Sequence, residues 1–273
     1  MVNNSENMEI IDSHCHLDFK DFEQDIISVL DRAREAGVCR MLSISTSLAR
    51  FPRVIEIAEK FEEVYCSVGV HPHEVKNECL REVDQLLKLV DHPKVIGIGE
   101  SGLDYHYEDN LLSEEQKHNF NIHIEASRIS RLPLIIHSRD ADGDMAELLE
   151  NEYSRGDFPF VLHCFTGGKT LADRALKLGG YISFSGIITF KNADILRSVA
   201  ANIPIGRLLV ETDAPYLAPV PFRGTRNEPA YVIHTHAALA AIKNVTPTEF
   251  SRTTTENFCK LFSKMPWMGS DIE

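Results

Sequence analysis

The chain has 273 residues and a formal net charge of −13, from 28 Lys and Arg against 41 Asp and Glu, and 43% of its residues are hydrophobic. This composition is typical of globular proteins and excludes global disorder, because the apolar residues suffice for a large core. Uniform acidity also argues against a general nucleic-acid coat protein, since it repels phosphate. An anionic substrate would need a locally positive site.

Targeting and redox features predict a cytoplasmic protein. Residues 1–8 are polar and lack the basic start and apolar core of a secretory signal. No apolar run approaches the ~20 residues of a membrane span, so we expect no membrane contact. The six cysteines contain no CxxC pair, which favours reduced thiols. Nothing in the sequence indicates an obligate protein partner.

Short apolar, β-branched runs alternate with amphipathic stretches along the whole chain, without a linker between them. The runs are apolar almost throughout, as in strands buried on both faces. Taken in chain order, the predicted strands cover residues 8–13, 40–45, 64–70, 94–99, 134–136, 160–162, 181–185 and 208–211. The clearest helical stretches cover residues 22–36, 53–61, 80–90, 113–130 and 141–153, and a terminal helix over 250–265 should pack on the barrel.

This alternation predicts an α/β protein built as a single (β/α)8 barrel of the TIM type over residues 1–273. A doubly wound open sheet is the alternative. The helix over 22–36 ends at Gly37, a common stop residue, and Ser113 followed by Gln116 resembles a capping box that opens the helix over 113–130.

Most of the informative polar residues lie at the C-terminal ends of the predicted strands, where barrel active sites are built. Because the strands are parallel, these side chains should meet at one rim. They are His14, His16, His71, Glu100, His137, His163 and Asp213.

The pair His14 and His16 directs two imidazoles to one side of an extended chain, since side chains alternate with period two. Alone, such a pair is more often an ordinary surface or core feature. With Glu100, His137, His163 and Asp213 at the same rim, metal binding becomes the better interpretation. Four imidazoles and two carboxylates exceed the needs of one ion that also holds water, so we expect two ions sharing a carboxylate.

Several neighbouring residues keep more than one interpretation. His71 contacts substrate, supports a metal ligand from behind, or is a structural histidine. Arg139 points into the site or pairs with Asp140. Glu211 shares the side of Asp213 and would orient ligands or hold substrate. Cys15 and Cys164 should point towards the helix layer, which disfavours a thiol hydrolase.

Seven motifs spread over the chain resemble, in order, those of the TatD family of metal-dependent hydrolases, within the wider amidohydrolase and phosphotriesterase-like superfamily. They are Asp12-Ser13-His14-Cys15-His16-Leu17, Gly69-Val70-His71-Pro72-His73, Gly99-Glu100-Ser101-Gly102-Leu103-Asp104-Tyr105, His137-Ser138-Arg139-Asp140, His163-Cys164-Phe165-Thr166-Gly167, Glu211-Thr212-Asp213-Ala214-Pro215-Tyr216 and Arg223-Gly224-Thr225-Arg226-Asn227-Glu228-Pro229.

The resemblance implies a TIM-type barrel with a pair of divalent metal ions. Zn, Mn, Mg, Co and Ni all remain open as the metal. Many relatives in the superfamily use a carboxylated lysine as the bridge, whereas a glutamate at this position favours the TatD branch. By this resemblance His14, His16 and Asp213 hold the first ion, His137 and His163 hold the second, and Glu100 bridges them.

The departures from the family pattern lie near the substrate rim. His106 and Tyr107 stand where many relatives carry a basic residue, and His123 replaces a commoner residue of the helix over 113–130.

The implied activity is hydrolysis of DNA phosphodiester bonds, on single strands or strand ends. Asp213 would bind one ion and accept a proton from water, and Arg139 or Arg223 would bind the non-bridging oxygens. The expected catalytic residues are Asp213, Glu100 and Arg139; the expected substrate contacts are His71, Arg139, Glu211 and Arg223, with Lys169 and Arg226 as further sources of positive charge.

Two other functions remain on the sequence alone. The same metal site would serve a hydrolase of small amides, lactones or phosphate esters, and the chain lacks the basic stripe with interleaved aromatics that single strands stack on. A non-catalytic scaffold is disfavoured because the ligand set is complete.

Overall fold

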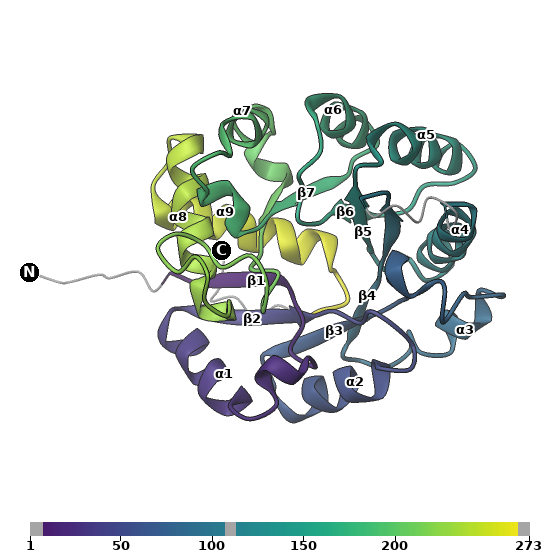
Figure 1. Ribbon diagram of the computed structural model, residues 1–273, viewed down its shortest axis with the longest axis horizontal. Helices are drawn as coiled ribbons and strands as arrows, with labels where there is room; N and C mark the ends of the chain where they lie inside the picture. Colours follow the sequence, from purple (N-terminus) through teal and green to yellow (C-terminus); the bar gives the residue numbers. More distant parts are fainter. Residues whose placement is uncertain (1–7, 107–112, 267–273) are drawn as a thin grey trace, which may run out of the picture.

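Eight parallel strands form one sheet in which each strand pairs with the next along the chain. The computed structural model describes residues 8–106 and 113–266, so Tyr107 lies outside the described residues. Figure 1 shows the strands around a centre with helices outside them. The strands are β1 (Ile10–Cys15), β2 (Val38–Ser43), β3 (Val64–Val68), β4 (Val95–Asp104), β5 (Leu134–Arg139), β6 (Phe160–Leu162), β7 (Tyr181–Phe184) and β8 (Leu208–Val210).

The first strand meets the segment that follows the last one. The backbone N–H of Asp213 donates to the carbonyl of His14 at 2.9 Å, and that of His16 donates to the carbonyl of Ala214 at 2.8 Å. Cys15 and Ala214 form a parallel bridge. The strand order and this contact confirm a TIM-type barrel and exclude the doubly wound sheet, whose strand order reverses.

Helices follow the strands around the outside of the barrel. The predicted helix over 80–90 is reduced to four residues, because the side-chain oxygen of Gln85 accepts hydrogen bonds from the backbone of Arg81 and Glu82 and delays the helix start. The described helices are α1 (Ile26–Glu35), α2 (Phe51–Lys60), α3 (Asp84–Leu87), α4 (Ser113–Ser130), α5 (Asp142–Tyr153), α6 (Lys169–Lys177), α7 (Asp194–Asn202), α8 (Val232–Lys243) and α9 (Pro247–Leu261).

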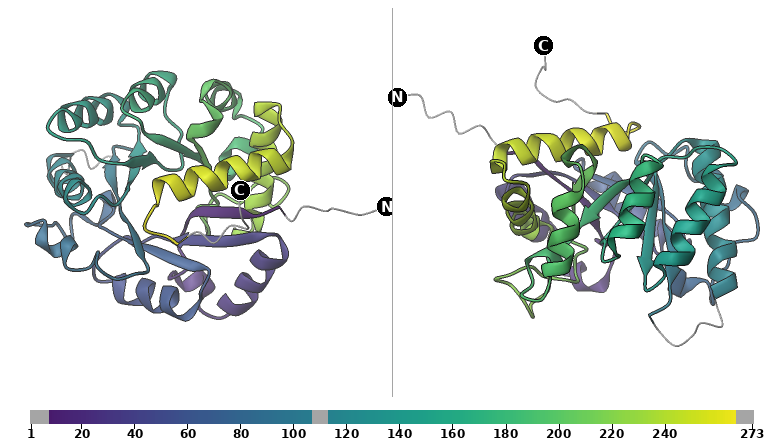
Figure 2. Two further views of the ribbon diagram at one scale, coloured as in Figure 1. Left: turned by 180° about the vertical axis from the view of Figure 1, so that it is seen from behind. Right: turned by 90° about the horizontal axis from the view of Figure 1, so that it is seen from above.

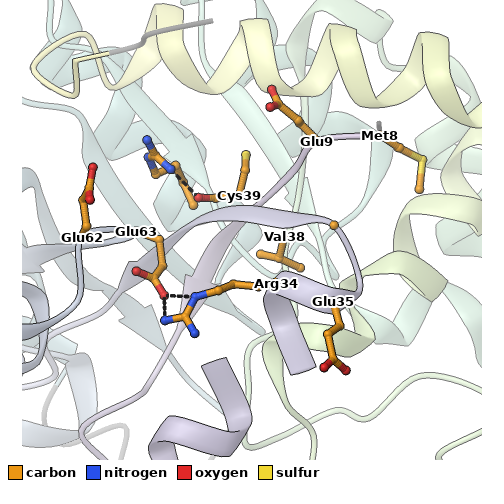
Figure 3. A pocket seen from close by; sticks show the side chains of 10 residues that line it. Met8, Glu9, Arg34, Glu35, Val38, Cys39, Glu62 and Glu63 are labelled. Atoms are coloured by element: carbon orange, nitrogen blue, oxygen red, sulfur yellow. Dashed lines mark hydrogen bonds and ion pairs between the residues drawn. The ribbon is translucent and has the colours of Figure 1, made fainter. Parts of the chain in front are cut away.

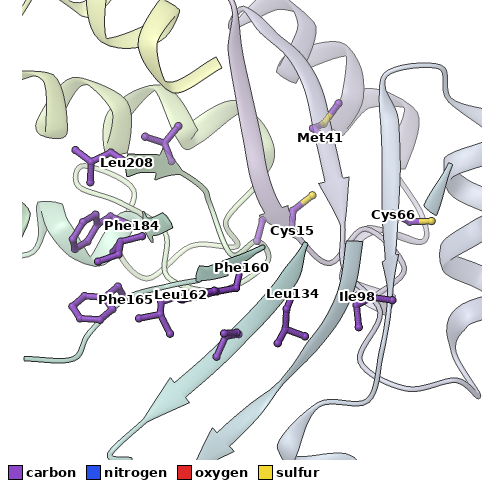
Figure 4. Close-up of a cluster of buried hydrophobic side chains, with 14 of the residues drawn as sticks. Cys15, Met41, Cys66, Ile98, Leu134, Phe160, Leu162, Phe165, Phe184 and Leu208 are labelled. Atoms are coloured by element: carbon purple, nitrogen blue, oxygen red, sulfur yellow. The ribbon is translucent and has the colours of Figure 1, made fainter. Parts of the chain in front are cut away.

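Two buried apolar clusters hold the barrel together. The larger packs strands against helices, and Figure 4 shows part of it, including Cys15, Leu134 and Phe184. The smaller fills the barrel interior and includes Phe258 and Phe262 of the α9 region.

The terminal helix closes one end of the barrel, as predicted. Figure 2 shows α9 lying across that end. Thr255 donates to the carbonyl of Glu9 just before β1, and Asn257 donates to the carbonyl of Leu208 at the start of β8. Helix α9 therefore covers the N-terminal ends of the strands and leaves the C-terminal ends for a site.

Two strands run further than their apolar residues indicate. β4 continues through Glu100 to Asp104, and β5 continues through His137 to Arg139. Gly102 has a φ of 151°, and a Cβ there would collide with the carbonyl oxygen of His137. Glycine therefore lets β4 lie against β5 beside a candidate site residue.

No helix within the described residues is long and apolar enough to cross a membrane.

Candidate metal centre

A cavity of about 840 Å³ opens at the C-terminal ends of the strands. Beneath it, His14 and Glu211 are fully buried. Most residues that the sequence assigned to the site line this cavity directly: His16, His71, Glu100, His137, Arg139, His163 and Asp213. The parallel barrel thus brings together side chains that are far apart in the chain.

One group of candidate ligands comes from β1, β4 and the segment after β8. The His14 Nε2 atom lies 3.3 Å from His16 Nε2, 3.4 Å from Glu100 Oε2 and 3.6 Å from Asp213 Oδ1. The His16 Nε2 atom lies 3.4 Å from Asp213 Oδ1 and 3.9 Å from Glu100 Oε2. Four ligand atoms held tetrahedrally by bonds of about 2.1 Å stand about 3.4 Å apart, so these distances fit a divalent cation.

A second group surrounds the other oxygen of the same glutamate. Glu100 Oε1 lies 2.6 Å from His163 Nε2, 2.8 Å from His137 Nδ1 and 3.4 Å from His71 Nε2. The ligand atoms of His137 and His163 are 3.3 Å apart. The structure therefore adds His71 to this group of candidate ligands, whereas from the sequence we expected it to contact substrate, to support a ligand or to be structural.

Glu100 is the side chain that both groups share. It is 2% exposed, and each of its two oxygens faces different imidazole nitrogens. Such a carboxylate can bridge two cations, because each oxygen can bind one of them. Apart from Glu100, the donors are imidazole nitrogens and the carboxylate of Asp213, which suit first-row divalent metals.

The ionisation of the carboxylates and of two of the histidines suits metal binding. Burial opposes ionisation of Glu100, but the neighbouring imidazoles, His163 foremost, outweigh it and hold the Glu100 pKa well below its usual range. Burial likewise opposes ionisation of Asp213, and the hydrogen bond to His16 lowers its pKa. Burial lowers the pKa of His14, and it lowers that of His71 to about 4. Both imidazoles are therefore neutral near pH 7, as ligands must be. For His16, His137 and His163, burial is outweighed by the neighbouring carboxylates, which raise the pKa, so a binding metal ion would displace their protons.

Two further carboxylates hold the outer nitrogens of the second group. His137 Nε2 lies 3.0 Å from Asp104 Oδ2, which also lies 2.8 Å from His73 Nε2. His163 Nδ1 lies 3.3 Å from Glu211 Oε1. Such contacts fix the tautomer and the ring orientation of a ligating histidine.

Asp12 fixes the first group through the backbone. Its carboxylate accepts hydrogen bonds from the Thr212 N–H at 2.9 Å and the Thr212 hydroxyl at 2.6 Å. It also accepts from the His14 N–H at 3.3 Å. These bonds tie β1 to the segment that carries Asp213.

Comparison with known proteins places the chain in a family. The family model described as TatD related DNase matches residues 11–263. The chain belongs to the TatD family of metal-dependent hydrolases. An uncharacterized metal-dependent hydrolase of Buchnera aphidicola is 42% identical over 94% of this chain and 97% of its own length. The uncharacterized metal-dependent hydrolase YcfH of Escherichia coli K12 is 41% identical over 93% of this chain and 96% of its own length.

A solved TatD structure shares the whole barrel. The crystal structure of the TatD homologue YjjV from Escherichia coli K12 superposes with a TM-score of 0.87 at 31% identity, covering 95% of this chain and 99% of that one. The barrel of this TatD protein is therefore that of its family.

The basic residues of this TatD chain are distributed differently from expectation. Among the described residues that line the cavity, Arg139 is the one with a permanent positive charge. Arg223 lies over the ring of Phe190 at 3.8 Å, and Arg226 forms a bidentate ion pair with Asp25. Lys169 pairs with Asp173 on the surface of α6. Positive charge near the site therefore comes chiefly from Arg139.

Glu211 has the position of an orienting residue. Besides His163, its Oε1 atom accepts the backbone N–H of Cys164 at 2.7 Å, and its side chain is fully buried away from the cavity. This position favours a role for Glu211 in orienting ligands over contact with substrate.

Asp140, at the rim of the cavity, accepts a hydrogen bond from His106 at 2.7 Å.

Two local expectations were wrong. Cys15 packs among core residues as predicted, but Cys164 borders the cavity, because its φ of 40° breaks the alternation of side chains. Its Sγ atom lies 3.1 Å from the hydroxyl oxygen of Ser185.

The predicted capping box at the start of α4 is absent, because the side-chain amide of Gln116 instead binds the backbone N–H and carbonyl of Asp104. It thereby holds the end of β4 at the site.

A second hollow, of about 540 Å³, lies at the N-terminal ends of the first strands (Figure 3). Four glutamates line it, and Arg34 is hydrogen-bonded to one of them, Glu63. Among the described residues, no candidate metal cluster includes a member of this hollow. The chemistry of the chain is therefore concentrated at the opposite end.

From the sequence we assigned no role to Asp104, His73, Phe19 or Tyr216, which also line the cavity. The first two and Tyr216 lie within the quoted motifs. Asp104 follows Glu100 by four residues in an extended strand and so shares its side. That spacing could have identified it, had β4 been extended past its apolar residues.

Proposed function

We propose that this TatD protein is a deoxyribonuclease that hydrolyses phosphodiester bonds at a two-metal site. The observation that carries the proposal is the position of Glu100, whose two oxygens face two separate groups of candidate ligands. The family description as a DNase supports DNA as the substrate. The six cysteines, none of them in a disulfide, fit a cytoplasmic location.

In this proposal His14, His16 and Asp213 would hold one ion, His137 and His163 would hold the other, and Glu100 would supply an oxygen to each. Bound divalent ions would act as Lewis acids and lower the pKa of water. Asp213, whose side chain is 14% exposed, reaches the cavity and accepts the proton of the attacking water. The water oxygen forms a bond to phosphorus, the bond to the leaving oxygen breaks, and that oxygen takes a proton from solvent. Arg139 binds the non-bridging phosphate oxygens.

A small-molecule hydrolase is the second candidate, and the charge of the cavity mouth favours it. Glu74, Asp104 and Asp140 line the cavity beside Arg139. With Asp104 and Glu211 next to the histidines, two divalent ions leave the site near electrical neutrality instead of strongly positive. A long polyanion would therefore gain little attraction beyond the cavity.

Hydrolysis of a labelled single-stranded DNA by metal-stripped protein, restored with Mg, Mn, Zn, Co or Ni in turn, tests the proposal. We expect cleavage with at least one metal and loss of at least about 100-fold in Glu100→Ala. Failure with every metal, together with turnover of small esters or amides, would establish the second candidate instead. The salt dependence should be shallow for a nuclease, since few phosphates meet a basic side chain.

A further inference from the structure

One side of the cavity is aromatic. Phe19 and Tyr216, which we call the aromatic wall, line the cavity together with Ile187 and Leu217. The rings of Phe19 and Tyr216 meet edge to face, with centroids 6.0 Å apart. The other side is polar and carries Glu74, Asp104, His106 and Asp140.

Each ring of the aromatic wall follows a candidate metal ligand by three residues. The backbone N–H of Phe19 donates to the carbonyl of His16 at 3.2 Å, and that of Tyr216 donates to the carbonyl of Asp213 at 2.9 Å. Two tight turns of the same kind therefore place an aromatic ring beside each of two ligands from the first group. Backbone hydrogen bonds therefore connect both residues of the aromatic wall to candidate ligands of the first group.

The wall is also held in a fixed position. The Phe19 ring stacks on the His16 imidazole with centroids 4.7 Å apart, and the Arg50 guanidinium lies over Phe19 at 4.8 Å. The side-chain amide of Asn227 donates to the carbonyl of Tyr216 at 2.6 Å and to that of Thr212 at 2.9 Å. A surface held in place before binding loses little conformational entropy when a ligand arrives.

Tyr216 is nevertheless 54% exposed. Aromatic rings with one polar end suit surfaces that become covered on binding. The Tyr216 ring stands at the cavity beside Phe19, and Ile187 and Leu217 also line it, so a flat ligand in the cavity could cover the ring.

We propose that the aromatic wall receives the nucleobase next to the cleaved phosphodiester bond. The base stacks on the exposed Tyr216 ring, because His16 and Arg50 already cover the two faces of the Phe19 ring. This inference rests on the proposed function and deepens it, because it gives the site a preference for unpaired nucleotides. A nucleobase is the flat, uncharged part of a nucleotide, and one sugar separates it from its phosphate. Stacking on aromatic side chains tolerates every base but requires a face that a duplex keeps covered. The phosphate then lies at the first ligand group, with Arg139 across the cavity.

The test uses the dinucleotide TpT, which contains a single phosphodiester bond, and its two abasic forms, each lacking one thymine. The metal-loaded wild type should cleave one abasic form about tenfold or more less efficiently in kcat/KM, chiefly through KM, since stacking of a base contributes about this factor. Tyr216→Ala should lose most of that discrimination, and Tyr216→Phe should keep it. Ile195→Ala, which removes an 83% exposed side chain on α7, should behave as wild type.

Circular dichroism and metal analysis of Tyr216→Ala confirm that the fold and the ion content are intact, and Tyr216→Leu serves as a second variant. Equal cleavage of all three dinucleotides by the wild type would overturn the wall as a base site, while the nuclease proposal stands. The base site would also be overturned if Tyr216→Ala and Tyr216→Leu both discriminated between TpT and its abasic form as strongly as the wild type does. If the wild type cleaves neither dinucleotides nor longer DNA with any metal, the proposed function fails, and the base site fails with it.

Discussion

Four carboxylates hold the imidazoles of the site, and they differ in what they contact. Glu100 and Asp213 face the nitrogens that would bind metal, whereas Asp104 and Glu211 face the outer nitrogens of His137 and His163. In the proposed assignment the second pair would orient the rings and leave metal binding to the first pair. A residue of this kind should therefore affect metal affinity through the histidine it orients.

Asp104→Asn should weaken binding of one of the two ions by about 10- to 100-fold and leave the other ion in place, because the amide orients His137 less strongly. Competition with a chelator of known affinity measures both constants. Asp140→Asn, which changes a rim carboxylate paired with His106, is the matched control and should bind both ions as the wild type does. Equal losses for both ions in Asp104→Asn would show general damage to the site instead.

His123 should make stability depend on pH. Its Nε2 atom accepts the Val70 N–H at 3.0 Å, its Nδ1–H donates to the carbonyl of Asn119, and burial lowers its pKa from 6.5 to about 4. The unfolded chain therefore binds a proton more readily. This stabilising contribution is complete above pH 6.5 and falls as the pH drops towards 4.

Urea unfolding at pH 7.5 and pH 5 measures the effect. The wild type should lose about 2 kcal/mol more of its free energy of unfolding between these values than His123→Gln, whose side chain does not titrate. Identical pH dependence in the two proteins would contradict the assignment.

The meeting of the histidines at one cavity was predictable, because alternation in a strand and position at a strand end are both visible in the sequence. His71 was placed at the rim but not among the ligands, since which of its nitrogens faces Glu100 depends on the turn after β3. Tyr216 gave no signal, because its exposure depends on a loop held by Asn227. Contacts between segments distant in the chain decide these details.

At the scale of elements, apolar runs predicted where the strands lie but not where they end. β4 and β5 extend into polar residues because those residues are buried by the site and not by the core. A strand that points its polar residues into a cavity has no apolar signature there. The predicted helix over 80–90 failed for another reason, since a glutamine side chain competes for its backbone.

Gly102→Ala tests the close approach of β4 to β5. The added methyl group would meet the backbone of His137, and the φ of 151° is strained for alanine, so we expect a loss of about 1–3 kcal/mol in stability. Binding of the second ion should weaken as well. Gly143→Ala, in the first turn of α5 where a Cβ meets open space, should be neutral or stabilising by up to about 1 kcal/mol. Thermal unfolding measures both variants, and equal stabilities would contradict the packing described.

At the scale of the whole molecule, the apolar residues that close the barrel and the residues of the candidate site lie at opposite ends of the strands. Helix α9 and the interior cluster close one end, and the ligands gather at the other. Part of the net charge of −13 lies in the site itself, where imidazoles and a single arginine stand beside Glu74, Glu100, Asp104, Asp140 and Asp213. Attraction for a phosphate would therefore come from bound cations and from Arg139.

Bound metal should stabilise the folded barrel, since the ligand groups exist only when distant segments are together. Metal at about 100 times its Kd contributes about 3 kcal/mol, which raises Tm by roughly 5–10 °C for a domain of this size. Thermal unfolding before and after removal of the ions with a chelator measures the shift. Glu100→Ala should show a smaller shift than the wild type, and an equal shift in both would place the ions elsewhere.

The most direct measurement of the shared role of Glu100 is metal content by elemental analysis, made on wild type and on Glu100→Ala after equilibration with Zn and removal of free ions. The two-group geometry predicts two ions per chain in the wild type and at most one in the variant, because the remaining groups lose their common ligand. One ion per chain in the wild type, or two in the variant, would contradict the bridging carboxylate.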